Sequence, residues 1–454
     1  MQHLWKSFFN EESGLGTALT TLFYRTPYKK TYYFLQQSQW WTNEQIKKYQ
    51  WQQLEKLVNH AYEHVPYYQN LFETRGIVPN DIKSLSDFQH LPFLTKELIQ
   101  EHEKELKATN YPLSAFEETI TGGSTGFPLR FYIEKGVWFA THLAYIRTLL
   151  ERANCHVMDP SVQITGRMKP WEYRPFLRTL VLSSFHMTEK NLAVYVKKIS
   201  RLTPRYIIGY PSAITLLASY MKNNALELNR LQAVVCYGET IYDWQREFLE
   251  AFFHCRVHGH YGHREQCVLA GTCEKSNMYH LFPEYGFTEL IDKNGVPVTQ
   301  ENEIGEIVAT GFHTSIFPFI RYRTGDLAVF TTQHCECGRH YQLVKNIEGR
   351  VQDFVVSKTH RLIPFMGVHH LVAHSSPNVK ECQLSQEQEG EIMFHIVKNE
   401  RFSDDDVRRI TTNFQKRFGN EFTVTFQYVD RIPRTSRGKY QFLIQKLPLH
   451  HIFE

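Results

Sequence analysis

Residues 121–128 are a run of glycines and hydroxyl side chains whose composition suits phosphate binding. The run is Thr-Gly-Gly-Ser-Thr-Gly-Phe-Pro. Glycines destabilise helix and strand interiors, but free backbone N–H groups and short O–H donors can hold phosphate oxygens. No Gly-Lys-Ser/Thr follows, which argues against a P-loop kinase or ATPase. The alternating residues 129–133 after it predict a strand, so the loop is expected at a hairpin tip; a flexible surface turn is the alternative.

Three further motifs carry groups that could serve a nucleotide. Tyr261-Gly262-His263-Arg264-Glu265 offers a base-stacking aromatic ring and a magnesium-binding acid, or is merely a strand end. Residues 319–326 predict a strand ending in Asp326 on a glycine turn, where the carboxylate could accept hydrogen bonds from sugar hydroxyls or only stabilise the turn. Residues 433–439 present Lys439 on a basic loop, which suits phosphate neutralisation or is a solvated charge run.

Four residues form a candidate metal site. Cys335 and Cys337 lie on one tight turn, and His280 follows Cys273 after seven residues. Two pairs of soft ligands suit structural zinc, and the alternative is four unrelated residues. A competing cluster alternates along an expected strand, which predicts core or pocket-lining side chains; its members are His254, Cys255, His258, His260, His263 and Cys267.

Alternating strands and helices must position these motifs. Strands are expected at 162–165, 180–184, 206–209 and 231–236, and helices at 137–151, 189–201, 211–223 and from 241 through 253. This alternation predicts a layered α/β domain with a largely parallel sheet. Ligands bind such sheets at the carboxyl ends of the strands, where Gly238-Glu239 and Tyr261-Gly262 are expected.

The two ends of the chain differ in residue composition and in the secondary structure that their patterns predict. Residues 1–40 form an aromatic, basic arm that we expect to pack on the main domain, with a peripheral membrane contact as the alternative. An amphipathic helix is expected over 44–64, and Thr95 is expected to cap a helix. After residue 279 the pattern becomes β-rich, and a small α+β unit is expected to begin near residue 350. The predicted domains are 1–349 and 350–454.

The composition is that of a globular protein with two or three domains: 454 residues, 42% hydrophobic and 22% charged. A net charge of +4 gives no argument for a nucleic-acid partner. We see no apolar run of membrane-spanning length and no secretory signal, so a cytoplasmic location with reduced thiols is expected.

Taken together and in this order, the motifs resemble the adenylate-forming acyl ligase superfamily, closest to its phenylacetate–CoA ligase-like and CapK-like branch. The resemblance covers nearly the whole chain, from about residue 54 to residue 446. It implies a large adenylation domain and a small mobile α+β C-terminal domain. It also implies ATP-dependent activation of a carboxylic acid as an acyl-adenylate, with Mg²⁺, and transfer to coenzyme A or to an amine or hydroxyl of a sugar in polysaccharide biosynthesis.

The resemblance also implies the site residues. Phosphate-loop residues are matched by Thr121, Gly122, Gly123, Ser124, Thr125 and Gly126, and the segment bordering adenine by Gly238 and Glu239. Tyr261, beside Gly262, matches the stacking aromatic residue, and Glu265 the magnesium ligand. Asp326 matches the ribose-binding aspartate, Arg350 the arginine at the domain junction, and Lys439 the catalytic lysine. The branch carries a similar Cys/His zinc cluster.

Three departures from the family pattern are visible. Leu129 follows the loop where lysine is common, leaving Arg130 as a candidate for that charge, and Gln352 stands where the interdomain pivot is commonly aspartate. These two motivate an alternative, a non-catalytic nucleotide-binding scaffold subunit. His263 and Arg264 replace small or hydroxyl residues before the glutamate, which bears on the choice of substrate. The acyl substrate, the acceptor and the oligomeric state do not follow from the sequence.

Overall fold

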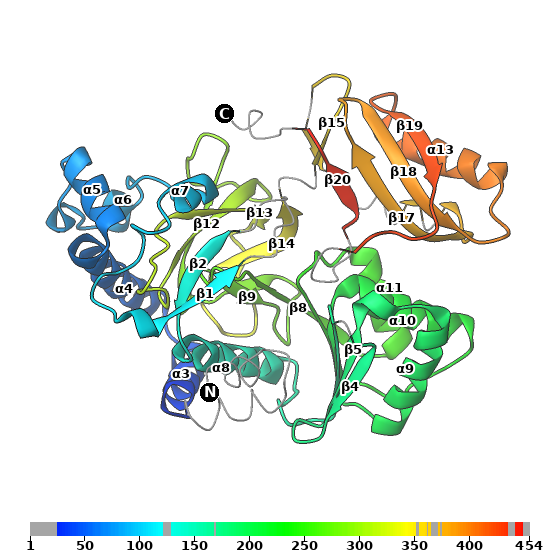
Figure 1. The fold of residues 1–454 in the computed structure, drawn as a ribbon, viewed down its shortest axis with the longest axis horizontal. Coiled ribbons are helices and arrows are strands. Elements are labelled where there is room, and N and C mark those ends of the chain that lie inside the picture. Colours follow the sequence, from blue (N-terminus) through cyan, green and yellow to red (C-terminus); the bar gives the residue numbers. More distant parts are fainter. Residues whose placement is uncertain are drawn as a thin grey trace.

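A twelve-stranded sheet dominates the described part of the chain (Figure 1). The computed structural model describes residues 25–120, 129–167, 169–350, 354–360, 362–364, 371–372, 375–434 and 441–447. In order across its mainly parallel half, the sheet contains β4 (Trp171–Arg174), β5 (Thr179–Ser183), β3 (Ser161–Thr165), β6 (Tyr206–Gly209), β7 (Ala233–Tyr237) and β8 (Arg256–Gly262). The edge strand β4 runs antiparallel to β5.

The other half of the sheet is antiparallel. It continues with β9 (Leu269–Gly271), β10 (Tyr279–Leu281), β14 (Leu343–Arg350), β13 (Tyr322–Phe330), β12 (Ile304–Gly311) and β11 (Gly286–Ile291). The change from parallel to antiparallel pairing falls between β8 and β9. The α/β class with a parallel-rich sheet and a β-rich part is confirmed.

Helices alternate with the parallel strands, as the sequence predicts. They are α9 (Glu189–Leu202), α10 (Pro211–Asn223) and α11 (Asp243–Phe253), which Figure 1 shows together on one side of β4 and β5. The side chain of Thr188 accepts a hydrogen bond from the Asn191 N–H and caps α9. Proline begins α10, where its fixed φ suits the first helical turn. Their apolar residues pack with those of β3, β5, β6 and β7 in one core cluster.

The N-terminal helices pack against the antiparallel half. Helix α4 (Asn43–His64) has a capping box at Thr42 and buries the predicted apolar stripe, which comprises Ile46, Leu54, Leu57, Val58 and Ala61. Val65 ends α4, and Pro66 begins α5 (Pro66–Arg75). Short helices follow at α6 (Leu85–Phe88) and α7 (Lys96–Glu101), and Thr95 caps α7 as expected.

The described part of the N-terminal arm, from residue 25, lies on the main body. Helix α3 (Arg25–Ser38) packs along α8 (Val137–Arg152). Tyr32 and Gln36 both donate hydrogen bonds to the Glu151 carboxylate, at 2.9 and 3.1 Å. Packing of the arm is therefore confirmed for α3, while residues 1–24 lie outside the described residues. Among the described helices, none is both long and apolar enough to cross a membrane.

A separate hairpin flanks the glycine-rich run. Strands β1 (Phe116–Ile120) and β2 (Arg130–Glu134) pair antiparallel, with Ile120 opposite Arg130. The strands on either side of the run 121–128 pair as expected for a hairpin, and the run itself lies outside the described residues. Leu129 at the base is fully buried, and Arg130 pairs with Glu118 at 3.7 Å.

The C-terminal part of the chain has its own sheet and core (Figure 1). The sheet order is β19 (Thr423–Tyr428), β18 (Glu391–Lys398), β17 (Val379–Gln386) and β20 (Leu443–Gln445). Helix α13 (Asp404–Phe418) buries Ile410 and Phe414 against it. A two-stranded sheet of β15 (Phe354–Val356) and β16 (Leu362–Pro364) precedes it. A domain boundary at residue 350 stays a prediction.

Candidate functional site

Tyr261 and Asp326, which lie far apart in the sequence, meet through a direct hydrogen bond. The Tyr261 hydroxyl donates to Oδ2 of Asp326 at 2.8 Å. Tyr261 is the second-to-last residue of β8, at the carboxyl end where ligands of such sheets bind. Two residues predicted from separate motifs to hold a base and a ribose are thus neighbours.

Asp326 lies on a bulge and not at a strand end, which corrects the prediction. Strand β13 continues to Phe330, and its register with β12 shifts between Glu306 and Val308. Gly325 has a φ of +74°, which favours glycine, and its N–H donates to the Glu306 carboxylate at 3.1 Å. A bulge changes the direction in which the Asp326 side chain points, and the strand continues beyond it.

Glu265 is a buried acid that accepts a hydrogen bond from Tyr322 and lies close to His263. The Tyr322 hydroxyl donates to Oε1 at 3.2 Å, and Nδ1 of His263 lies 3.1 Å from Oε2. Burial and the adjacent Glu265 carboxylate raise the pKa of Tyr322, so its hydroxyl keeps the proton that it donates. Tyr322 was not singled out from the sequence, although it lies within the predicted 319–326 segment.

Arg264 connects this acid to the phosphate-loop hairpin. Its Nε donates to Oγ1 of Thr119 at 3.0 Å, and Thr119 is next to the last residue of β1. The strand that leads into residues 121–128 therefore contacts the segment that carries Glu265. Carboxylate oxygen is a preferred ligand of Mg²⁺, which is usually shared with substrate phosphates, so Glu265 fits a magnesium-binding role.

Gly238 and Glu239 follow the carboxyl end of β7, as expected. Gly238 has a φ of +77°, and the Glu239 carboxylate accepts a hydrogen bond from the Ser212 N–H at 3.1 Å. Ser212 lies at the start of α10, where an acceptor stabilises the unpaired N–H groups of the first turn. The loop between β7 and α11 is thereby tied to α10.

Several predicted site residues cannot be placed. Those outside the described residues are Thr121, Gly122, Gly123, Ser124, Thr125, Gly126, Gln352 and Lys439. The backbone of Arg350 lies opposite Asp326 in the β13–β14 pair, but its side chain is outside the described residues. Their roles stay predictions.

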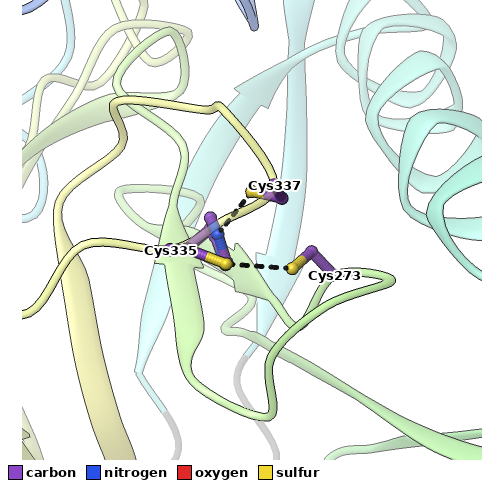
Figure 2. Close-up of side chains that lie close together, drawn as sticks. Cys273, Cys335 and Cys337 are labelled. Carbon is purple, nitrogen blue, oxygen red and sulfur yellow. Dashed lines mark hydrogen bonds between the residues drawn. The ribbon is translucent and has the colours of Figure 1, made fainter.

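The predicted metal ligands do come together. The ligand atoms of Cys273, His280, Cys335 and Cys337 all lie within 4.8 Å of one another. Sγ of Cys273 is 3.5 Å from Sγ of Cys335, and Sγ of Cys337 is 3.3 Å from Nε2 of His280. Figure 2 shows the cysteines converging from two loops. Within the described ranges this is the one group of this kind, and the competing histidine-rich cluster does not converge in the same way.

The surroundings of this cluster suit a bound cation. Nδ1 of His280 lies 3.2 Å from the Met278 carbonyl, which orients Nε2 toward the thiols. The N–H groups of Lys275 and Ser276 each donate to Sγ of Cys273 at 3.3 Å. Hydrogen bonding from Cys273 lowers the pKa of the Cys337 thiol. Three thiolates and one imidazole form a donor set typical of structural zinc.

Comparisons with known proteins agree with these features. Residues 355–446 match the family model of the CapK C-terminal domain. The chain is 25% identical to Protein CapK of Staphylococcus aureus, over 87% of this chain and 88% of that protein. It is 23% identical to the phenylacetate-coenzyme A ligase of Thermus thermophilus, over 87% of this chain and 95% of that protein. The chain is thus similar to CapK and to the phenylacetate–coenzyme A ligases. The expected family resemblance is confirmed.

The fold of this protein is also found in a solved ligase structure. A crystal structure of 2-hydroxyisobutyryl-CoA ligase in the postadenylation state matches it with a TM-score of 0.72 at 19% sequence identity. The match covers 91% of this chain and 92% of that ligase. The predicted fold class is thus confirmed over nearly the full length.

Proposed function

We propose that this protein is an AMP-forming acid ligase that uses ATP to activate a carboxylic acid as an acyl-adenylate. The observation that carries the proposal is the Tyr261–Asp326 hydrogen bond, with Glu265 buried four residues after Tyr261. This arrangement lies at the carboxyl end of β8, and Arg264 beside it contacts β1, the strand that precedes residues 121–128. The relatedness to acid–coenzyme A ligases supports the same activity.

The first half-reaction joins the substrate carboxylate to the α-phosphorus of ATP and breaks the bond to pyrophosphate. The carboxylate is already a nucleophile, so positioning and charge neutralisation carry the catalysis. The Tyr261 ring would stack on adenine, and Asp326 would accept hydrogen bonds from the ribose hydroxyls. Glu265 would hold Mg²⁺, which neutralises phosphate charge when bound.

The remaining roles fall on residues known only from the sequence. The amides and hydroxyls of 121–126 would hold the β- and γ-phosphates, and Lys439 would bridge the α-phosphate and the acyl carboxylate. Arg350 would lie at the junction of the two domains, with its backbone opposite Asp326.

In the second half-reaction a nucleophile attacks the acyl carbon and AMP leaves. We propose the thiol of coenzyme A as this acceptor, because phenylacetate-coenzyme A ligases are among the relatives. The relationship to Protein CapK keeps open a sugar amine or hydroxyl in polysaccharide biosynthesis. A structural zinc ion and a cytoplasmic location complete the proposal.

Carboxylate-dependent exchange of labelled pyrophosphate into ATP tests the first half-reaction directly. We expect exchange with at least one member of a panel of aryl, fatty, amino and sugar acids. Exchange with none of them would contradict the proposal and favour the non-catalytic scaffold. One observation favours that second candidate: Leu129, where the family often has lysine, is fully buried and brings no charge to the loop.

Asp326→Ala is expected to weaken ATP binding about 10- to 100-fold. A charge-assisted hydrogen bond to a ribose hydroxyl contributes roughly 1.5–3 kcal/mol. Calorimetric titration with ATP measures the change, and circular dichroism checks the fold. Asp405→Ala, on the exposed side of α13, is the matched control. Unchanged ATP affinity in Asp326→Ala would remove Asp326 from the nucleotide site.

A further inference from the structure

Three side chains among residues 260–266 have buried polar atoms without hydrogen bonds. In the described part of the chain, Nε2 of His260, both ring nitrogens of His263 and both amide atoms of Gln266 have no hydrogen-bond partner. Gln266 is 1% exposed and His260 9%. Nδ1 of His263 is near Glu265, as described, but without hydrogen-bond geometry. We call His260, His263 and Gln266 the polar triplet.

Unsatisfied groups of this kind are costly, and native proteins keep few of them. Each buried donor or acceptor without a partner costs roughly 1–3 kcal/mol. Three such side chains within seven residues of sequence therefore require an explanation. A ligand that hydrogen-bonds to them in the working enzyme would supply one.

Helix α8 brings aromatic and imidazole rings close to His260. Trp138 stacks on His142, with ring centroids 5.4 Å apart and an interplanar angle of 19°. The Tyr285 hydroxyl lies 3.4 Å from Nδ1 of His142. His142 is close enough to His260 to influence its charge.

Tyr145 and His313 lie in the same region as Gln266, the last residue of the triplet. Tyr145 and His313 are linked by a 3.0 Å hydrogen bond between the hydroxyl and Nε2. The Gln266 carbonyl lies so near Gly311 that a side-chain Cβ there would come within 2.9 Å of it. Gly311 is two residues before His313, so Gln266 and the Tyr145–His313 pair belong to one region.

The imidazoles of His260 and His313 are neutral at physiological pH because burial lowers their pKa values. Burial lowers the pKa of His260 to about 3 and that of His313 to about 4. A neutral imidazole has one donor and one acceptor nitrogen. The region therefore suits neutral groups that both donate and accept, such as hydroxyls and amides, better than a second anion.

We propose that the polar triplet binds the acyl part of the substrate, and that this substrate is a carboxylic acid carrying hydroxyl or amide groups. The inference rests on the proposed acid-ligase function and specifies its substrate class. A plain aryl or alkyl acid would leave the triplet atoms unpaired. Sites built to hydrogen-bond a substrate hydroxyl reject the analogue that lacks it by large factors, up to about 10⁴–10⁵.

The first test compares acids of equal carbon skeleton in the pyrophosphate-exchange assay. The pairs are phenylacetic and hydroxyphenylacetic acids, hexanoic and gluconic acids, and pentanoic and 4-carbamoylbutanoic acids. We expect kcat/KM to be at least about 100-fold higher for the more heavily hydroxylated or amidated member of the best pair. Equal use of both members, or preference for the plain acids, would overturn this inference while leaving the ligase function intact. Exchange with no acid would overturn both.

The second test uses Gln266→Met and His260→Phe, which keep size but remove hydrogen-bonding atoms. In each variant the ratio of kcat/KM for the preferred acid to kcat/KM for its plain partner should fall at least about 10-fold. ATP affinity should stay unchanged, because neither residue lies at the Tyr261–Asp326 pair. Replacing an unpaired buried polar group by an apolar one is neutral or stabilising, so Tm should not fall. A lower Tm with equal losses for both acids would show a structural role and contradict the proposal.

Discussion

Lys439→Ala should reduce acyl-adenylate formation by about 100- to 1,000-fold while leaving ATP binding nearly intact. A lysine that reaches the α-phosphate only when the C-terminal domain closes over the main one stabilises charge only in the transition state. Its loss therefore lowers kcat with little effect on substrate affinity. Single-turnover formation of acyl-AMP, followed by quenching and chromatography, measures the effect.

A chemically made acyl-AMP separates this role from a general loss of function. Given that intermediate, the Lys439→Ala protein should transfer the acyl group to its acceptor at close to the normal rate. Lys446→Ala is a matched control, because Lys446 lies in the same part of the chain and pairs with Glu387 on the surface. Normal adenylate formation by Lys439→Ala, or equal failure in both half-reactions, would deprive Lys439 of a catalytic role.

Removal of the Cys335 and Cys337 thiols has the second large expected effect. Wild-type protein purified without chelator should contain close to one zinc per chain, and Cys335→Ser combined with Cys337→Ser should contain none. A metal present at 1,000 times its dissociation constant stabilises the folded state by about 4 kcal/mol, so Tm should fall by roughly 10 °C in the double variant. Plasma mass spectrometry and differential scanning calorimetry are the measurements.

The control for this experiment is Cys255→Ser, since Cys255 does not belong to the ligand cluster. It should keep the metal and most of the stability. A wild type that is metal-free and equally stable before and after chelator treatment would contradict the zinc assignment.

Local sequence signals were enough to predict most elements. Helix α10 begins and ends where expected, because Pro211 fixes its start and an apolar stripe runs through it. The strands on either side of residues 121–128 were predictable from alternation. The Cys273, His280, Cys335 and Cys337 cluster was predictable because metal ligands keep recognisable spacings.

Features that depend on distant packing were not predictable. The bulge at Asp326 requires Glu306 on the neighbouring strand to hold Gly325. Tyr322 gains its role from Glu265, which lies 57 residues away. No local pattern encodes either pairing. The lack of hydrogen bonds to the Gln266 amide was also not predictable, because it depends on which groups surround the side chain in the folded protein.

The position of β14 between β13 and β10 has a kinetic consequence. Tyr279 in β10 pairs with Val344 in β14. This strand pair cannot form until the chain segment between them, which contains β11, β12 and β13, has brought its two ends together. Non-local pairing of this kind slows folding, because loop-closure entropy is spent before the contacts that compensate for it appear. Cys273 and Cys335 lie near the ends of that same loop. A metal ion bound early by these cysteines would bring β10 and β14 close together before they pair. Refolding from denaturant should therefore be slower with chelator than with zinc.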